Sequence, residues 1–250
     1  FGVILITTKS GAQSDKFEIS YSNNFSWQDP AKKIEIGGIE ALQYTLDAQT
    51  NRREPMPAGG FWRISPESLE KAIEWQNLYG GKVKWNDPVV YGRDWFYDGK
   101  DKYGYRLYDG AKAMIKNWTP TMTHNLSVNG KSGKTSYNIG LGYLDQSGMS
   151  KTAKKDDFKR YNASVSVTSE INKYITVRAS SIYSDRNKRY PGIGNTTADP
   201  WLYLYRWSPL MPMGVTENGN PLKEPTYEMA AANTDNLQNK YYNINLGFTL

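Results

Sequence analysis

The chain of 250 residues is 38% hydrophobic and 14% aromatic and carries a formal net charge of +6. It has no cysteine, which excludes a disulfide framework and a thiolate metal site. No run of about 18 apolar residues occurs, which excludes a transmembrane helix. The low mean hydropathy of −0.69 does not exclude a barrel, because only alternate residues of a barrel strand meet lipid. The basic residues accompany no nucleic-acid recognition motif, so we interpret them as exposed loop residues.

The first stretch of the sequence is apolar, FGVILITTKSG. Its aliphatic residues from 3 to 6 have no polar alternates, which predicts a strand that is covered on both faces. The sequence begins with Phe1 and ends with Leu250, each within an apolar run, so we expect a segment of a longer polypeptide. No signal peptide is recognisable in it.

Residues 17–27 predict a strand of another kind, in which apolar and polar side chains alternate. A period of 2 is typical of a strand with one apolar and one polar face. The apolar set ends in aromatic residues and comprises Phe17, Ile19, Tyr21, Phe25 and Trp27, with Asn23 as its one polar member.

The connection from 28 to 120 is long and mixed. The spacing of Ile39, Leu42 and Leu46 predicts a helix over 39–51. A second helix is predicted over 65–79, with Ser65 at the N-cap, Pro66 at the first helical position and an acid in the first turn. A connection of this length with its own helices is uncommon and is usually functional.

The clearest pattern is a β-hairpin with arms over 121–129 and 135–145, joined by a glycine-rich turn. The first arm places Met122, His124, Leu126 and Val128 on one face. The apolar face of the second arm has an aromatic residue at each end, in the order Tyr137, Ile139, Leu141, Tyr143. Such residues suit a transmembrane barrel strand, because their rings lie at the two water–lipid boundaries. A tilted strand of about 9–11 residues crosses the bilayer.

Three further strands are predicted over 158–169, 173–184 and 240–250. The connections along the chain alternate between long and short. Outer-membrane barrels have short periplasmic turns and long extracellular loops. The predicted fold is therefore all-β, part of a large antiparallel transmembrane β-barrel over 12–250. Its extracellular loops would be 28–120, 146–157 and 185–239, and the first of them carries the short helices.

Two stretches of the sequence resemble SusC-type TonB-dependent outer-membrane transporters. FGVILITTKSG is similar to the end of that family's plug domain, which assigns residues 1–11 to the plug. THNLSVNGKSGKTSYNIGLGYLDQSGM is similar to a strand–turn–strand of the family's barrel. The resemblance is strongest over 1–27 and 117–185, and the 28–116 region departs from the family pattern.

The resemblance implies a barrel of about 22 strands with an N-terminal plug, in the outer membrane of a Gram-negative bacterium. It implies TonB-dependent import of a bulky nutrient, a glycan or an oligopeptide, and no enzymatic activity or cofactor. The partners would be the lipid bilayer, a SusD-type surface lipoprotein acting as a lid, and the TonB complex. The residues that contact TonB would lie outside this segment. No nucleic acid is expected.

Two sets of polar residues are candidates for a catalytic or metal site. His124 is the only histidine and falls in an apolar set, so we interpret it as an interfacial side chain rather than a catalytic base. The acids at 87, 94, 98 and 101 do not fit a calcium loop and are interpreted as a polar turn-rich region. No metal site is predicted.

Aromatic residues of the long connections are the candidates for substrate or lid contact. Sugars stack on aromatic rings, and Tyr and Trp add a polar group. The alternative is that these rings pack the loops together or form the lid interface. The candidates are Trp85, Trp95, Tyr97, Trp201, Tyr203, Tyr205 and Trp207.

Two other functions remain open from the residues alone. The first is a secreted β-rich adhesin or ligand-binding domain, in which the apolar faces would pack against a second sheet. The second is a barrel enzyme, which the single, poorly placed His124 disfavours.

Overall fold

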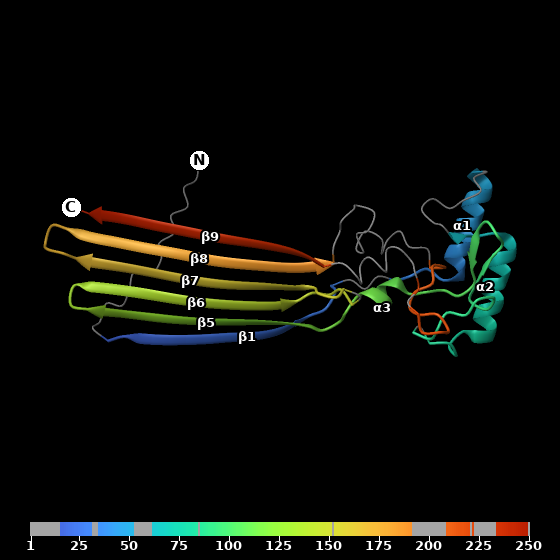
Figure 1. Cartoon of the computed structure of the whole chain (residues 1–250), viewed down its shortest axis with the longest axis horizontal. Helices are drawn as coiled ribbons and strands as arrows, with labels where there is room; N and C mark the ends of the chain where they lie inside the picture. The colour runs from blue at the N-terminus through green and yellow to red at the C-terminus, as the bar shows by residue number, and fades with distance from the viewer. Residues whose placement is uncertain are drawn as a thin grey trace.

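The computed structural model describes residues 16–31, 35–52, 62–84, 86–151, 153–191, 209–220, 222 and 234–249. It consists of a six-stranded antiparallel sheet and a mixed region at one end of that sheet (Figure 1). The strand order is β1-β5-β6-β7-β8-β9. Neighbouring strands of this sheet are therefore also consecutive along the chain, apart from the long insertion between β1 and β5. The strands are β1 (Glu18–Gln28), β5 (Thr119–Ser132), β6 (Thr135–Ser147), β7 (Asp157–Glu170), β8 (Thr176–Pro191) and β9 (Thr234–Thr249).

Each of the six strands overlaps a range that alternation predicted, but several are longer. β8 continues to Pro191 and β9 starts at Thr234, so these strands take in both ends of the predicted loop 185–239. β8 begins at Thr176 rather than at residue 173. The Asn172 side chain accepts hydrogen bonds from the backbone N–H groups of residues 174 and 175, and this Asx turn delays pairing. The predicted plug segment, residues 1–11, lies outside the described residues.

The sheet is open, with β1 and β9 at its two edges in the described part of the chain. The turn between β5 and β6 contains Gly133 at φ +57, a conformation that glycine adopts without steric cost. None of the helices in the described ranges is long and apolar enough to span a membrane.

The region beyond the loop end of the sheet contains three helices and a small three-stranded sheet. The helices are α1 (Ile39–Arg52), α2 (Pro66–Tyr79) and α3 (Gly110–Met114). The small sheet has the order β2-β4-β3 and consists of β2 (Trp62–Arg63), β4 (Lys102–Gly104) and β3 (Trp95–Tyr97). We call this region the loop module and define it as the described residues of 35–118 and 209–222.

The start of α2 follows the sequence prediction. Ser65 is the N-cap, its side chain accepts from the Ser68 N–H, and Pro66 occupies the first turn. Ser68 reciprocates by accepting from the Ser65 N–H at 2.8 Å, which completes a capping box. α3 and the small sheet were not predicted, because two to five residues are too short to show a period.

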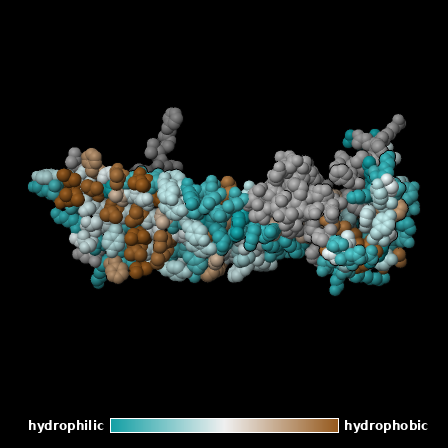
Figure 2. Space-filling view, viewed as in Figure 1, coloured by the Kyte–Doolittle hydropathy of each residue, from teal (hydrophilic) through white to brown (hydrophobic). Residues whose placement is uncertain are grey.

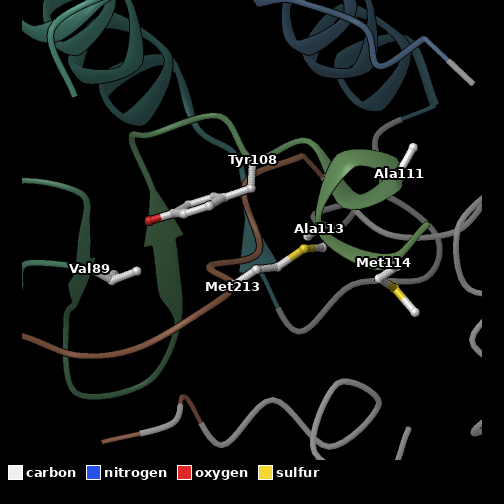
Figure 3. Packing of buried hydrophobic residues seen from close by; sticks show 6 residues of the cluster. All are labelled: Val89, Tyr108, Ala111, Ala113, Met114 and Met213. Atoms are coloured by element: carbon white, nitrogen blue, oxygen red, sulfur yellow. The ribbon is translucent and has the colours of Figure 1, made fainter. Parts of the chain in front are cut away.

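The loop module has a hydrophobic core in two clusters. One cluster packs α1, α2 and Leu210, and the other joins Val89, Tyr108, Met213 and α3. Figure 3 shows the Tyr108 ring extending toward Val89 and the Met213 side chain extending toward α3. Backbone hydrogen bonds from Tyr108 to Pro209 (2.7 Å) and from Val89 to Val215 (2.8 Å) connect the same segments. Two connections that are far apart in sequence therefore fold together.

Candidate functional site

The first candidate site is the apolar face of the six-stranded sheet. The register aligns apolar residues of all six strands on this face, and one cross-strand row runs through Ile19, Val128, Ile139, Val165, Ser181 and Ile244. Large side chains on it are exposed, with Leu246 at 80%, Phe248 at 75% and Ile244 at 71%. In Figure 2 hydrophobic side chains gather over the end of the sheet away from the loop module. An exposed apolar surface of this extent indicates a site that meets another apolar phase.

A belt of aromatic rings borders this face on the side of the loop module. Tyr143 lies 5.0 Å from Tyr161 between ring centroids, and Tyr183 lies 4.7 Å from Tyr242. His124 belongs to this belt, because its Nδ1 is 2.7 Å from the Tyr21 hydroxyl and its ring also contacts Phe25 and Tyr143. The register places Asn23, the polar exception in its strand, opposite His124. Polar and aromatic side chains thus share one row at the border.

Charged pairs begin immediately beyond this belt on the same face. Lys159 Nζ is 3.1 Å from the Asp145 carboxylate. Arg189 binds Asp157 through two hydrogen bonds of 2.7 Å. The change from aromatic to paired charged side chains within two residues of a strand marks a sharp polarity boundary.

Aromatic residues also occur toward the hairpin end of the face, where Tyr137 and Phe248 lie in β6 and β9. The Tyr137 ring covers Gly130 on β5, and a Cβ at that glycine would collide with it. Six residues separate Tyr137 from Tyr143, which gives a band of about 20 Å along the strand. This is close to the apolar band of about 25 Å that outer-membrane barrels present.

The opposite face of the sheet is polar and carries small side chains over much of its area. The described pairs include Asn129 with Asn138, and Ser184 with Asn162 at 2.9 Å. A shallow trough of about 350 Å³ runs over β1, β5, β6 and β7, where Gly140 and Gly142 leave the backbone uncovered. Small polar side chains allow another part of a protein to approach this face closely.

The loop module is organised around a buried carboxylate, Asp94, which is 0% exposed. The carboxylate accepts hydrogen bonds from Trp75 Nε1, the Val90 N–H and the Arg93 guanidinium at 2.8 to 2.9 Å. Arg106, 2% exposed, approaches it at 3.4 Å and donates to the carbonyl oxygens of residues 84 and 87. Burial raises the pKa of the Asp94 carboxyl, but the hydrogen bonds from Arg93, Val90 and Trp75 outweigh it and leave this pKa below its ordinary value.

The geometry of Asp94 assigns it a structural role, since its oxygens are used by protein donors. No group of three or more metal-ligating side chains occurs among the described residues, so the acids at 87, 94, 98 and 101 form no cluster of that kind there. Sequence reasoning placed Asp94 in a polar turn and missed its burial, because Trp75, Arg93 and Arg106 meet it only in the folded loop module.

The structure describes two of the seven aromatic candidates for substrate or lid contact. Trp95 is part of the small sheet and packs edge-on against Tyr91 with ring centroids 5.0 Å apart, whereas Tyr97 is 44% exposed. The other five candidates lie outside the described residues: Trp85, Trp201, Tyr203, Tyr205 and Trp207.

The fold adds exposed aromatic residues that the sequence did not single out. Tyr91 stacks on Phe96 with centroids 6.0 Å apart, and both rings are at least 40% exposed. Phe96 also borders an open groove of about 450 Å³ between the small sheet and α2, together with Tyr103 and Tyr105. The sequence did not distinguish these rings, because they lie in or beside short, turn-rich strands among many other aromatic residues.

Comparisons with known proteins gave structural matches only. No protein-family description matches the chain, and no curated protein matches it. One similar solved structure is the RagAB peptide importer in its closed-closed state, which matches over 86% of the chain at 23% identity with a TM-score of 0.47. The same importer in its open-open state matches over 72% of the chain at 23% identity with a TM-score of 0.45. A structure of the RagAB peptide transporter is similar to 88% of it, at 22% identity and a TM-score of 0.47.

The chain spans less than a quarter of the length of these solved chains, at 23%, 19% and 24%. The activity, substrate and partners of a whole transporter therefore do not follow from this likeness.

Proposed function

We propose that the chain is part of a SusC-type transporter of the outer membrane of a Gram-negative bacterium. Its six strands form part of the wall of a barrel of about 22 strands. The transporter imports a bulky nutrient, a glycan or an oligopeptide, with energy from TonB. Residues 1–11 end the plug domain, the connections 28–120, 146–157 and 185–239 lie outside the cell, and the two short turns lie on the periplasmic side.

One observation carries this proposal: an exposed apolar face that ends at an aromatic belt and then at paired charges. In water the apolar side chains of this face would stay exposed to solvent, which is unfavourable. In a bilayer they contact lipid, the aromatic rings lie at the headgroups, and the charged pairs lie beyond them. The residues that would face lipid are Leu126, Val128, Tyr137, Ile139, Leu141, Val165, Val177, Ile244 and Leu246. Those that would face the lumen or plug are Asn125, Ser127, Asn138, Ser164, Ser166, Asn243 and Asn245.

The competing function, a soluble adhesin, needs a second layer over this face. No second sheet packs on it in the described part of the chain, where the small sheet belongs to the loop module. Fractionation distinguishes the two functions, because the transporter requires detergent to leave the membrane fraction. Release of the folded full-length protein by salt or alkaline washing would contradict membrane insertion.

A matched pair of substitutions tests which face meets lipid. Leu141→Arg should cost about 2–4 kcal/mol of folding free energy, because it places a cation at mid-membrane depth on the lipid side. Asn138→Arg, on the opposite face of the same strand, should cost far less. The measurement is reversible unfolding of the full-length protein in lipid vesicles. Equal costs for the two variants would contradict the assignment of faces.

The loop module is the proposed docking surface for a SusD-type lipoprotein lid. It has a core of its own and presents exposed aromatic residues, which anchor interfaces more often than other residues do. Deletion of 61–116 should leave an inserted barrel that no longer retains its lid during purification. Undiminished co-purification of the lid would place the docking surface elsewhere.

A further inference from the structure

Three cations lie together on the polar face of the sheet, near the end that adjoins the loop module. Arg160 on β7 and Arg186 on β8 are directly opposite each other in the register. Their Cα atoms are therefore about 5 Å apart. Lys188 lies on the same face, one row further toward the loop module, opposite Phe158.

On the polar face, the described strands place no acidic side chain in the rows next to the two arginines. Their own row and the rows on either side consist, apart from Lys188, of uncharged residues in the described strands. Asp156, four residues before Arg160 and about 13 Å away along an extended chain, accepts a hydrogen bond from the Ser150 N–H at 2.8 Å.

The apolar face at the same height is arranged differently. There Lys159 pairs with Asp145, and Arg189 pairs with Asp157. Each of these cations has its own carboxylate on a neighbouring strand. If the cations served only solubility, there would be no reason for them to be paired with acids on the apolar face and unpaired by register on the polar face.

Like charges that face each other across strands are destabilising, so the arginine pair favours an anion. Two guanidinium groups present forks of N–H donors that match the oxygens of a carboxylate. The Arg160 Nε is also buried and has no hydrogen-bond partner in the described structure. An unpaired buried donor costs free energy that an acceptor would recover. The geometry, the charge and the hydrogen-bond donors of this arginine pair therefore all favour binding of an oxyanion.

We propose that Arg160, Arg186 and Lys188 form a binding site for a carboxylate group of the imported molecule. This inference rests on the proposed function, in which the polar face lines the lumen and the loop end is the entrance. Both nutrient classes supply such a group, as a uronic acid in a glycan or an acidic residue in an oligopeptide. The site therefore selects acidic members of either class.

The test measures binding of a fluorescently labelled triglutamate peptide to the full-length transporter in detergent, with labelled triglutamine as the uncharged probe. Triglutamate should bind more tightly, and added salt should weaken its binding. Arg160→Gln and Arg186→Gln should each weaken triglutamate binding about tenfold, because each removes a charge-assisted hydrogen bond. Arg178→Gln should leave binding unchanged, since Arg178 lies on the same face of β8 but eight residues away, about 26 Å.

The stability of the same variants distinguishes a ligand site from an internal ion pair. Arg160→Gln should not lower the melting temperature of the free protein, because it relieves repulsion. A lowered melting temperature together with no binding of triglutamate would mean that an acid of the protein itself fills the site, and would overturn the proposal. Equal loss of binding in Arg178→Gln would also overturn it, by showing general charge attraction. Neither result affects membrane insertion, which the fractionation and the Leu141→Arg pair test separately.

Discussion

The sheet and the loop module place their apolar side chains in opposite ways. Every hydrophobic residue that is buried in the described structure belongs to the loop module, and none belongs to the six strands of the sheet. The strands instead expose Leu, Ile, Phe and Tyr side chains on one face. The loop module is thus built like a water-soluble domain, with a core and a buried ion pair. The sheet has the distribution expected where the solvent itself is apolar on one side.

This difference is sharpest at the charged residues. In the loop module Asp94 and Arg106 are fully buried, and their hydrogen bonds hold segments around residues 75, 84–94 and 106 together. In the sheet the paired charges lie beyond the aromatic belt, outside the apolar band. Perturbations that unfold one region should therefore leave the other intact.

The largest effect should come from Asp94→Ala. This change removes the buried carboxylate that accepts from Trp75, Val90 and Arg93 and faces Arg106, and it should cost about 3–5 kcal/mol in the loop module. We expect rapid proteolysis between residues 62 and 118, whereas the barrel should keep its heat-modifiable mobility on gels. Glu74→Ala is the matched control, because Glu74 forms only an exposed pair with Lys71. Loss of the barrel signal in Asp94→Ala would show that the two regions fold as one unit.

A pair of leucine truncations should separate the regions by their cores. Leu69→Ala removes a side chain that is 5% exposed in the core of the loop module and should cost about 2–5 kcal/mol there. Leu246→Ala removes one that is 80% exposed on the sheet and leaves no cavity, so its cost in lipid vesicles should be smaller. Hydrogen exchange measured separately in the loop module and in the sheet gives the free-energy cost of each substitution. A larger cost for Leu246→Ala would contradict the claim that the sheet face is unburied within the chain.

Acid should open the loop module before the sheet. The folded-state pKa of Asp94 lies below its unfolded value, so the stability it contributes is present above the unfolded pKa and is lost as pH falls through the folded one. The effect should be smaller than that of Asp94→Ala, because the protonated carboxyl keeps some hydrogen bonds. We expect increased hydrogen exchange in the loop module below about pH 4. Asp94→Asn should abolish this pH dependence; an unchanged profile in that variant would assign it to other acids.

The smallest effect concerns the start of α2. Ser65→Ala removes the N-cap acceptor and should destabilise the helix by about 1 kcal/mol. Ser65→Asp should restore most of this loss, because aspartate also caps helices. Hydrogen exchange at the amide of Ser68, which donates to Ser65, reports the change directly. Equal exchange in all three proteins would show that tertiary packing alone holds the helix end.

The sequence by itself determined the features that depend on neighbouring residues. Alternation located all six strands of the sheet, because side chains along a strand point to opposite faces with a period of 2. Ser65, followed by Pro66 and Glu67, located the start of α2, because capping is a contact over three residues. The same local rules placed His124 on the apolar face and predicted its interfacial character.

Only the tertiary structure decided which distant residues meet. Strand register brought Arg160 opposite Arg186, and His124 against Tyr21 and Phe25. Packing of the loop module buried Asp94 against Trp75 and Arg106 and joined Tyr108 to Met213. No local pattern encodes these contacts, because their partners lie up to 105 residues apart in the chain, as Tyr108 and Met213 do. Such contacts form only when register and packing are fixed for the whole chain at once.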